Sequence, residues 1–297
     1  MYAAAIREAS HVGLNVWLGA DLVSRWLEGP KSFRTGIAEL GRLASLPNVV
    51  GIKIADELGY HDGFDNDFGA IMRFLTHTAN ALHRVAPGKL ILIDISVPQL
   101  GCAPGVQAVA LQSRACMVED AAKYPALTLP NIDRMFASHT VDVVDLSTFL
   151  ADPTTYASWG ISLDAAQQAA WHEAIRRGWQ NDVTLQSRKA MAFPGSYRGT
   201  AQQVAQNLRT YAVLPTTMGA QAVDIWTWRQ TYDGHVVHLT NPGLAPNALW
   251  DGLVRLHRQG IDLFTHFTPS SVEESVPADL RELSRAFSDV FMAAGIG

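Results

Sequence analysis

Six short segments of the chain carry strand-like patterns of apolar residues, and most are followed by a stretch with helical periodicity. They span residues 13–21, 49–57, 89–96, 141–149, 183–193 and 222–230. Strands that alternate with helices in this way predict an α/β fold with a parallel sheet. In a parallel barrel the active site lies at the carboxyl ends of the strands, so the polar residues at these ends are the candidates for function.

The rest of the pattern consists mainly of helices. They are expected over residues 2–11, 32–45, 66–85, 131–138, 163–178, 200–213, 246–258 and 277–293. Residues 97–130 are rich in Pro and Gly and are expected to be irregular. Asp233-Gly234 predicts a small hairpin over residues 232–240.

Six strands are two short of a closed eight-stranded barrel. Either two weak strands are concealed in the pattern, or the first two βα units are absent from this chain. The second interpretation fits better, because the first helix has no strand before it. We therefore predict a single (β/α)8 TIM-barrel-like domain over residues 1–297, without its first two βα units and with a C-terminal helical extension over about residues 270–297. Such an open barrel would expose the edges of the strands at 13–19 and 222–230 and would favour association.

Charged residues fall on the strand faces that should point to the barrel axis, since alternate residues of a strand face opposite sides. In residues 49–57, Lys53 and Glu57 share one face, and three aliphatic residues share the other. The same argument places a further set of residues inside: Asp21, Asp94, Asp145, Asp224, Trp17, Trp226 and Trp228. In the fifth segment either Arg188 or Lys189 points inward, but not both.

Buried charges need partners because their desolvation is costly. Lys53 can therefore have a structural role, in which it neutralises Asp94 or Asp224 inside the barrel. For Glu57, which stands at the carboxyl end of its strand, a functional role is favoured.

Composition and charge restrict the class of partner. The net charge is −5, and the sequence has no run of basic residues, so we expect neither a nucleic-acid nor a membrane partner. No apolar stretch approaches the roughly 20 residues of a membrane-spanning helix. The N-terminal residues lack the pattern of a signal peptide, so a cytoplasmic protein is expected unless a preceding segment is missing. The oligomeric state stays open.

Cysteine and histidine usage predicts no cofactor. Cys102 and Cys116 could form a disulfide in an oxidising compartment, but two free thiols are the favoured interpretation. The ten histidines are scattered without a zinc-binding pattern. A metal site made of Asp56, His61 and Asp62 is a weaker alternative, and we predict no metal.

Two short motifs resemble those of TIM-barrel glycoside hydrolases of the clan-A type. IADELGY resembles the end of their fourth strand, where an Asn-Glu pair provides the general acid/base; Asp56 replaces the Asn and Glu57 matches the Glu. DIWTWRQ resembles their eighth strand, and Trp226 matches the Trp that forms the floor of the sugar site. The order and spacing of the strands are similar over about residues 10–260. The segment TLQSRKAMAFPG lacks the acidic nucleophile that the retaining enzymes carry on their seventh strand.

The resemblance implies a carbohydrate-active hydrolase that cleaves a glycosidic bond. Such a reaction needs a protonated carboxyl group and a second, ionised one. We predict Glu57 as the general acid, with Asp94 or Asp145 as its partner in one cleft. The residues expected to bind the carbohydrate are Asp21, Trp17, Trp226, Trp228, Arg229 and Gln230.

Two other functions remain open at this point. The interior carboxylates could hold a divalent cation in a metal-dependent barrel isomerase or lyase. The missing acid of the seventh strand is also consistent with a non-catalytic barrel that binds sugar.

Overall fold

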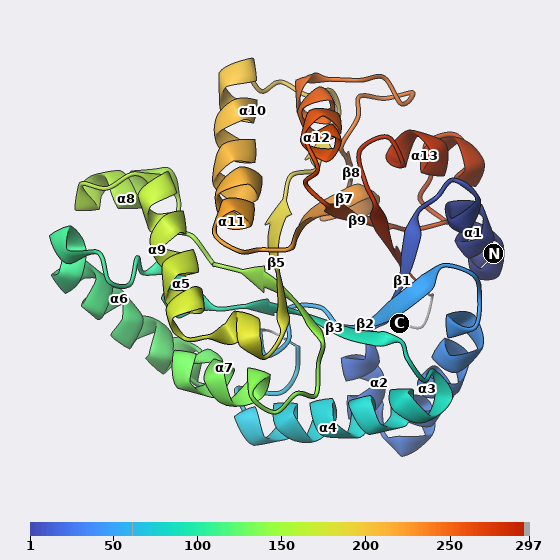
Figure 1. Cartoon of the computed structure of the whole chain (residues 1–297), viewed down its shortest axis with the longest axis horizontal. Helices are drawn as coiled ribbons and strands as arrows, with labels where there is room; N and C mark the ends of the chain where they lie inside the picture. The colour runs from blue at the N-terminus through green and yellow to red at the C-terminus, as the bar shows by residue number, and fades with distance from the viewer. Residues whose placement is uncertain (61, 294–297) are drawn as a thin grey trace.

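Eight parallel strands form a closed barrel in the computed structural model, which describes residues 1–60 and 62–293. Figure 1 shows these strands in the middle of the molecule with helices around them. In ring order the strands are β1 (Asn15–Gly19), β2 (Val49–Ala55), β3 (Leu90–Ser96), β4 (Val143–Ser147), β5 (Thr184–Ala190), β7 (Ala222–Tyr232), β9 (Leu263–Phe267) and β10 (Asp289–Ala293). Pairing of β10 with β1 closes the ring. The predicted TIM-barrel-like α/β fold is confirmed.

The prediction that two βα units are missing is wrong. The two additional strands, β9 and β10, follow the six predicted ones in the chain and complete the ring. Both are five residues long and buried on both faces, so they lack the alternation that reveals a half-exposed strand. The segment 277–293, which was expected to be one helix, contains a short helix followed by β10. The edges of β1 and β7 that we expected to be exposed are paired with β10 and β9.

Thirteen α-helices occur in the described part of the chain. They are α1 (Tyr2–His11), α2 (Leu22–Glu28), α3 (Pro30–Ala44), α4 (Phe68–Val85), α5 (Pro98–Gly101), α6 (Ala110–Lys123), α7 (Leu129–Phe136), α8 (Pro153–Trp159), α9 (Leu163–Arg176), α10 (Ala201–Leu208), α11 (Leu214–Thr217), α12 (Ala248–Arg258) and α13 (Val276–Leu283). None of them combines the length and the hydropathy needed to cross a lipid bilayer.

Helix α1 covers the strands that close the barrel. Helix α1 contacts α13, β1 and β10, and its buried residues Ala5, Ile6 and Ala9 belong to the main hydrophobic core. It thus lies where a barrel normally has the helix that follows its last strand. The C-terminal region expected as a helical extension consists of α13 and β10 over its described residues.

An antiparallel extension continues β7 beyond the barrel. Strand β7 pairs with β8 (His235–His238) through the predicted hairpin, and β8 also pairs with β6 (Phe193–Pro194). At the turn, Asp233 and Gly234 both have positive φ angles, of 48° and 72°, which these residue types tolerate best. The hairpin prediction is confirmed.

Apolar side chains fill one end of the barrel interior. Trp17 packs there against Phe264 and Phe291, with ring centroids 6.1 and 6.2 Å away, and its Nε1 donates to Asp289 Oδ1 at 3.0 Å. A Cβ atom on Gly51 would lie 2.2 Å from Trp17 Cζ3, so the indole fits only because residue 51 has no side chain. The rest of the cluster consists of Leu92, Val143 and Ala222.

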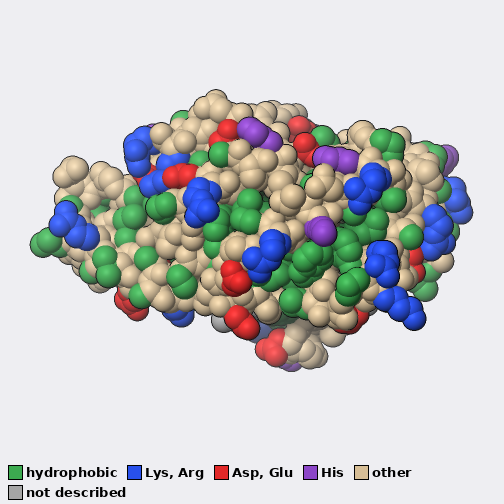
Figure 2. All heavy atoms as spheres, turned by 90° about the horizontal axis from the view of Figure 1, so that it is seen from below, with side chains coloured by type: hydrophobic (Ala, Val, Ile, Leu, Met, Phe, Trp, Pro, Cys, Tyr) green, Lys and Arg blue, Asp and Glu red, His purple; other side chains and the backbone are tan. Residues whose placement is uncertain are grey.

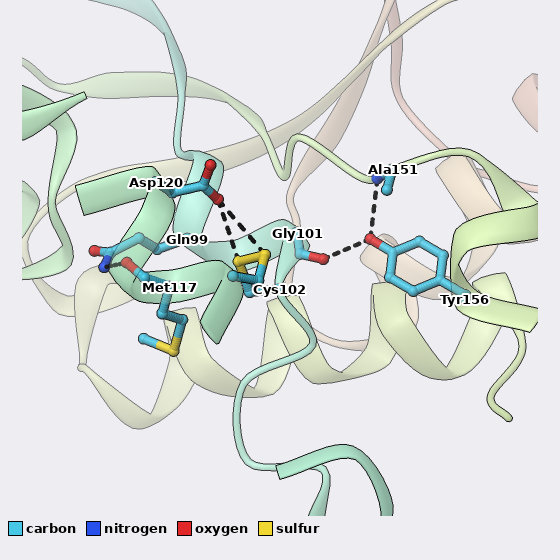
Figure 3. Close-up of a disulfide and its surroundings, with 8 residues drawn as sticks. Gln99, Gly101, Cys102, Met117, Asp120, Ala151 and Tyr156 are labelled. Carbon is cyan, nitrogen blue, oxygen red and sulfur yellow. Dashed lines mark hydrogen bonds between the residues drawn. A yellow bond between two sulfur atoms is a disulfide. The ribbon is translucent and has the colours of Figure 1, made fainter. Parts of the chain in front are cut away.

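A disulfide links the end of α5 to α6 (Figure 3). Cys102 and Cys116 are bonded, with Cα atoms 5.6 Å apart, so the expectation of two free thiols is wrong. Helix α6 lies in the segment expected to be irregular, and Ser113 is its one buried residue. Disulfides persist mainly in oxidising compartments.

Reduction of this disulfide should release α6. The cross-link closes a loop of about 15 residues, for which a stabilisation of about 3 kcal/mol is typical. Urea denaturation with and without dithiothreitol should show a loss of this order. Hydrogen exchange should increase across residues 110–123 and little in the barrel strands. A protein in which Cys102 and Cys116 are both replaced by Ser should not respond to the reductant. Equal protection of α6 in the two redox states would contradict the prediction.

Candidate active site

A polar cavity of about 210 Å³ lies at the carboxyl ends of several barrel strands. Strands β1, β2, β7, β9 and β10 or the residues directly after them contribute to its wall. The polar and aromatic residues of the lining that matter below are Asp21, Lys53, Asp56, Trp226, Gln230 and His266. Barrel enzymes bind their substrates at this end of the strands.

The ammonium group of Lys53 lies among acidic and imidazole groups. Its Nζ is 2.7 Å from Asp56 Oδ1, 3.4 Å from Asp94 Oδ2 and 3.4 Å from His266 Nε2. Burial alone would lower the pKa of Lys53, but the charges of Asp56 and Asp94 raise it above its ordinary value. Lys53 is therefore a permanent positive charge at the wall of the cavity, although the residue is only 3% exposed.

Arg188 joins the carboxylates of three strands. Its Nε lies 2.6 Å from Asp94 Oδ2 and 3.7 Å from Asp224 Oδ2, and its Nη1 lies 3.1 Å from Glu57 Oε1. Burial disfavours the cation, but Asp94 and its acidic neighbours raise the pKa of Arg188 above its usual value. Of the two alternatives in the fifth segment, Arg188 faces the carboxylates, and Lys189 Nζ lies 4.2 Å above the ring of Tyr211.

Asp224 and His266 form a carboxylate–imidazole pair. His266 Nε2 lies 3.1 Å from Asp224 Oδ2, and Nδ1 makes no hydrogen bond to the described residues. Burial and the nearby Lys53 lower the pKa of His266, so its imidazole is neutral near pH 7. With Nε2 donating to Asp224, Nδ1 would be the basic nitrogen. A carboxylate that fixes the tautomer of a neutral imidazole is an arrangement suited to general base catalysis.

The three carboxylates expected to be catalytic differ in their surroundings. Glu57 follows β2, and its side chain is 43% exposed and contacts Arg188. Asp94 is fully buried against Arg188 and Lys53. Asp145 is fully buried, and neither of its oxygens has a hydrogen-bond partner in the described chain. Burial, together with the charge of Asp224, raises the pKa of Asp145 well above its usual value, so we assign it as a neutral acid.

The structure thus brings Glu57 and Asp94 together at Arg188 but not at the cavity. Neither they nor Asp145 belong to the cavity wall, where Asp56 is found instead. Although burial acts in the opposite direction, Lys53 and Arg188 hold the pKa of Asp56 well below its usual range.

Half of the residues expected to bind substrate do line the cavity. These are Asp21, Trp226 and Gln230. Asp21 also caps α2, since its carboxylate accepts from the Ser24 backbone N–H at 3.1 Å.

The other three expected binding residues lie elsewhere. Trp17 belongs to the apolar end of the barrel, and Arg229 forms an ion pair with Glu273. Trp228 donates from Nε1 to Asp279 Oδ2 at 2.9 Å among the outer helices. Alternation failed for Trp228 because the pairing of β7 with β9 shifts register between Ile225 and Arg229. Such an irregularity redirects the side chains beyond it.

His266 and the inward orientation of Arg188 were not found from the sequence. His266 was missed because β9 was not recognised as a strand. The signal available was the short, mostly apolar run LFTHF, which follows a helix and Gly260.

Comparison with known proteins gives no family assignment. No protein-family model and no curated protein matches the sequence. The solved structures similar to the chain include domains of pyruvate carboxylase from Rhizobium etli.

A variant of its carboxyl transferase domain with pyruvate is 12% identical with a TM-score of 0.48, and the match covers 98% of this chain and 42% of that one. The same domain with 3-bromopyruvate is 11% identical with a TM-score of 0.45, and the match covers 98% of this chain and 41% of that one. A variant of pyruvate carboxylase with acetyl coenzyme-A is 12% identical with a TM-score of 0.43, and the match covers 97% of this chain and 24% of that one. The chain spans less than half of the length of these proteins. At these values the similarity carries no argument about activity.

The prediction of a glycoside hydrolase in carbohydrate metabolism is wrong. It depended on counting the strand before Glu57 as the fourth and the strand of Trp226 as the eighth. In the closed barrel they are the second and the sixth in chain order. Glu57 also lies beside a guanidinium group and solvent, not in the apolar pocket that a general acid requires.

The donor atoms at the cavity do not fit a divalent cation. Within the described residues, the one group of at least three His, Cys, Asp or Glu side chains whose ligand atoms lie within 4.8 Å of one another is Cys102, Cys116 and Asp120, away from the barrel mouth. Lys53 and Arg188 already contact the interior carboxylates. In the weaker alternative, Asp62 accepts hydrogen bonds from the backbone of Gly59 and Phe64, and His61 lies outside the described residues.

Replacing Arg188 should strongly destabilise the barrel. In Arg188→Met the carboxylate of Asp94 would remain buried without its nearest cation, for which a cost of about 3–5 kcal/mol is typical. Urea denaturation should show this loss. The double variant Arg188→Met/Asp94→Asn should recover part of it, because the unpaired charge is removed as well.

A matched control is Arg209→Met, which breaks the exposed ion pair with Asp164. It should cost about 1 kcal/mol or less. Similar losses in the two single variants would argue against Arg188 as the cation that holds the interior together.

Proposed function

We propose that the chain is a barrel enzyme of the isomerase or lyase type, which removes a proton next to the carbonyl group of a small polar substrate. The observation that supports this most is the Asp224–His266 pair beside Lys53. His266 Nε2 lies 3.4 Å from Lys53 Nζ, and both residues line the cavity. This arrangement joins a general base to a fixed positive charge, and proton abstraction next to a carbonyl needs both.

In this proposal His266 is the base. Nδ1 takes the proton from the substrate carbon, and Nε2–H donates to Asp224, which stabilises the imidazolium that forms. The electron pair of the broken C–H bond moves into the carbonyl group and creates an oxyanion. In an isomerase of a hydroxy carbonyl compound, the hydroxyl proton on the deprotonated carbon passes to the oxyanion, and His266 returns its proton to the former carbonyl carbon. In a lyase the electron pair instead expels a leaving group from the carbon next to the deprotonated one, and the carbonyl group is restored.

Lys53 stabilises the oxyanion. Its contact to Asp94 is 3.4 Å long and can be exchanged for a shorter one to the substrate. Its ammonium thereby supplies the positive charge that a divalent cation supplies in metal-dependent barrel enzymes. Arg188 acts on Lys53 indirectly, because it shares Asp94 and Asp56 with it.

The size and lining of the cavity favour a small ligand. About 210 Å³ is less than the roughly 300–1,000 Å³ of most ligand pockets. Asp21, Gln230 and the rim at Trp226 offer hydrogen bonds and one aromatic surface. The carbohydrate substrate expected from the sequence stays a prediction, so the substrate panel includes small sugars beside keto and hydroxy acids.

Solvent isotope exchange tests the proposal directly. The protein is incubated in D2O with 2-keto acids, 2-hydroxy acids, and small aldoses and ketoses, and deuterium incorporation is followed by proton NMR. His266→Asn should reduce the exchange by about 10²–10⁴-fold. The matched control His172→Asn, an exposed residue of α9, should leave it unchanged.

Absence of exchange with every compound, or full exchange by His266→Asn, would contradict the proposal. Sugar binding without exchange, reduced by Trp226→Ala, would instead support the non-catalytic sugar-binding barrel.

Both activity and stability should depend on the protonation of His266. Its pKa is lowered in the folded protein, whereas in the unfolded chain it is about 6.5. As the pH falls below about 6.5, the unfolded chain binds more protons than the folded one, so the free energy of unfolding decreases. Exchange activity should fall on the acid side with an apparent pKa below 6.5.

Urea denaturation at a series of pH values should show this decrease for the natural protein and a smaller one for His266→Asn. An acid limb of activity above pH 6.5 would contradict the assignment.

A further inference from the structure

The largest apolar groove of those described lies outside the barrel, between the helices that follow β1 and β2. Its volume is about 730 Å³, against about 210 Å³ for the cavity at the strand ends. Its floor consists of Trp26 from α2, Phe33 and Ile37 from α3, and Ala81 from α4. Figure 2 views the molecule from the side of these helices and shows apolar side chains gathered there, with basic and histidine side chains around them.

The floor is shaped by aromatic contacts. Trp26 meets Phe33 and His77 edge-on, with centroids 5.2 and 5.4 Å away. Trp26 also contacts Phe74 at 6.0 Å, which ties α2 to α4. The side chains of the floor are thus fixed by packing and do not need to rearrange to accept an apolar chain.

The charged residues at the groove are all basic. Arg34 from α3 and Arg84 from α4 line it together with His77, and no Asp or Glu belongs to its lining. Arg34 and Arg84 are exposed and have no ion-pair partner within the described chain. This local excess of positive charge contrasts with the net charge of −5 for the whole protein.

We infer that the groove binds a free long-chain carboxylate. The alkyl chain would cover the apolar floor, and Arg34 and Arg84 would hold the carboxylate together, since the planar guanidinium has matching donor geometry. Charge complementarity decides the class of ligand, because a neutral or cationic amphiphile would leave both guanidinium groups unpaired. This site is separate from the cavity at the strand ends and does not depend on the function proposed for it.

Sodium dodecanoate, below its micelle concentration, is the probe. Isothermal titration should give a dissociation constant on the order of 10⁻⁵–10⁻⁴ M, in line with the efficiency of ligands of this size. Arg34→Gln and Arg84→Gln should each weaken binding about tenfold, as expected for the loss of a charge-assisted hydrogen bond. Arg42→Gln on α3, outside the groove, is the matched control and should bind normally.

Two further variants distinguish binding in this groove from binding elsewhere on the protein. His266→Asn should bind dodecanoate like the natural protein, because it alters the cavity at the strand ends alone. Ala81→Trp should abolish binding by filling the floor, and the arginine variants keep the test valid if this variant does not fold.

Several results would overturn the inference. The first is the absence of binding at 1 mM dodecanoate, a concentration that exceeds the expected dissociation constant by about tenfold or more. The second is an affinity for dodecyltrimethylammonium equal to that for dodecanoate. The third is an affinity of the arginine variants for dodecanoate equal to that of the natural protein. Sedimentation with anionic phospholipid vesicles in the absence of any dodecanoate binding would assign the surface to a membrane instead.

Discussion

The ion-pair network inside the barrel is the interaction on which both the core and the cavity depend. Lys53 and Arg188 neutralise carboxylates that β2, β3 and β7 position around the axis, and Asp94 touches both cations. Removing either cation would leave charges in a region with little water, where unpaired ions are costly. The barrel interior is therefore divided, with aromatic packing around Trp17 at one end and ionic contacts toward the other.

This division explains why the cavity is polar and small. The cations are held by the same carboxylates that they neutralise, so their positions are fixed before any ligand arrives. Burial raises the pKa of both Asp94 and Asp145, but only Asp94 contacts Lys53 and Arg188, and neither oxygen of Asp145 has a hydrogen-bond partner in the described chain.

The sequence was sufficient for the fold class and for six of the eight strands, because those strands are long or bounded by clear turns. It was insufficient for β9 and β10, whose residues are buried on both faces and give no period of two. Missing β9 also hid His266, and the wrong strand count produced the false match of Glu57 to a glycosidase acid. The outward position of Trp228 follows from a register shift that no single-strand pattern reveals. Arg188 and Lys189 could not be distinguished, because either long side chain is chemically suited to pair with the interior acids.

Closure of the ring has a consequence for how the chain folds. Asn15 of β1 is paired with Asp289 of β10, near the other end of the sequence. Such a non-local contact is entropically costly to form and is typical of slow steps in folding. During synthesis β1 must therefore wait, with one edge unpaired, until β10 has emerged. Helix α1 contacts β1 directly and can shield its outer face during this interval, before α13 and β10 arrive.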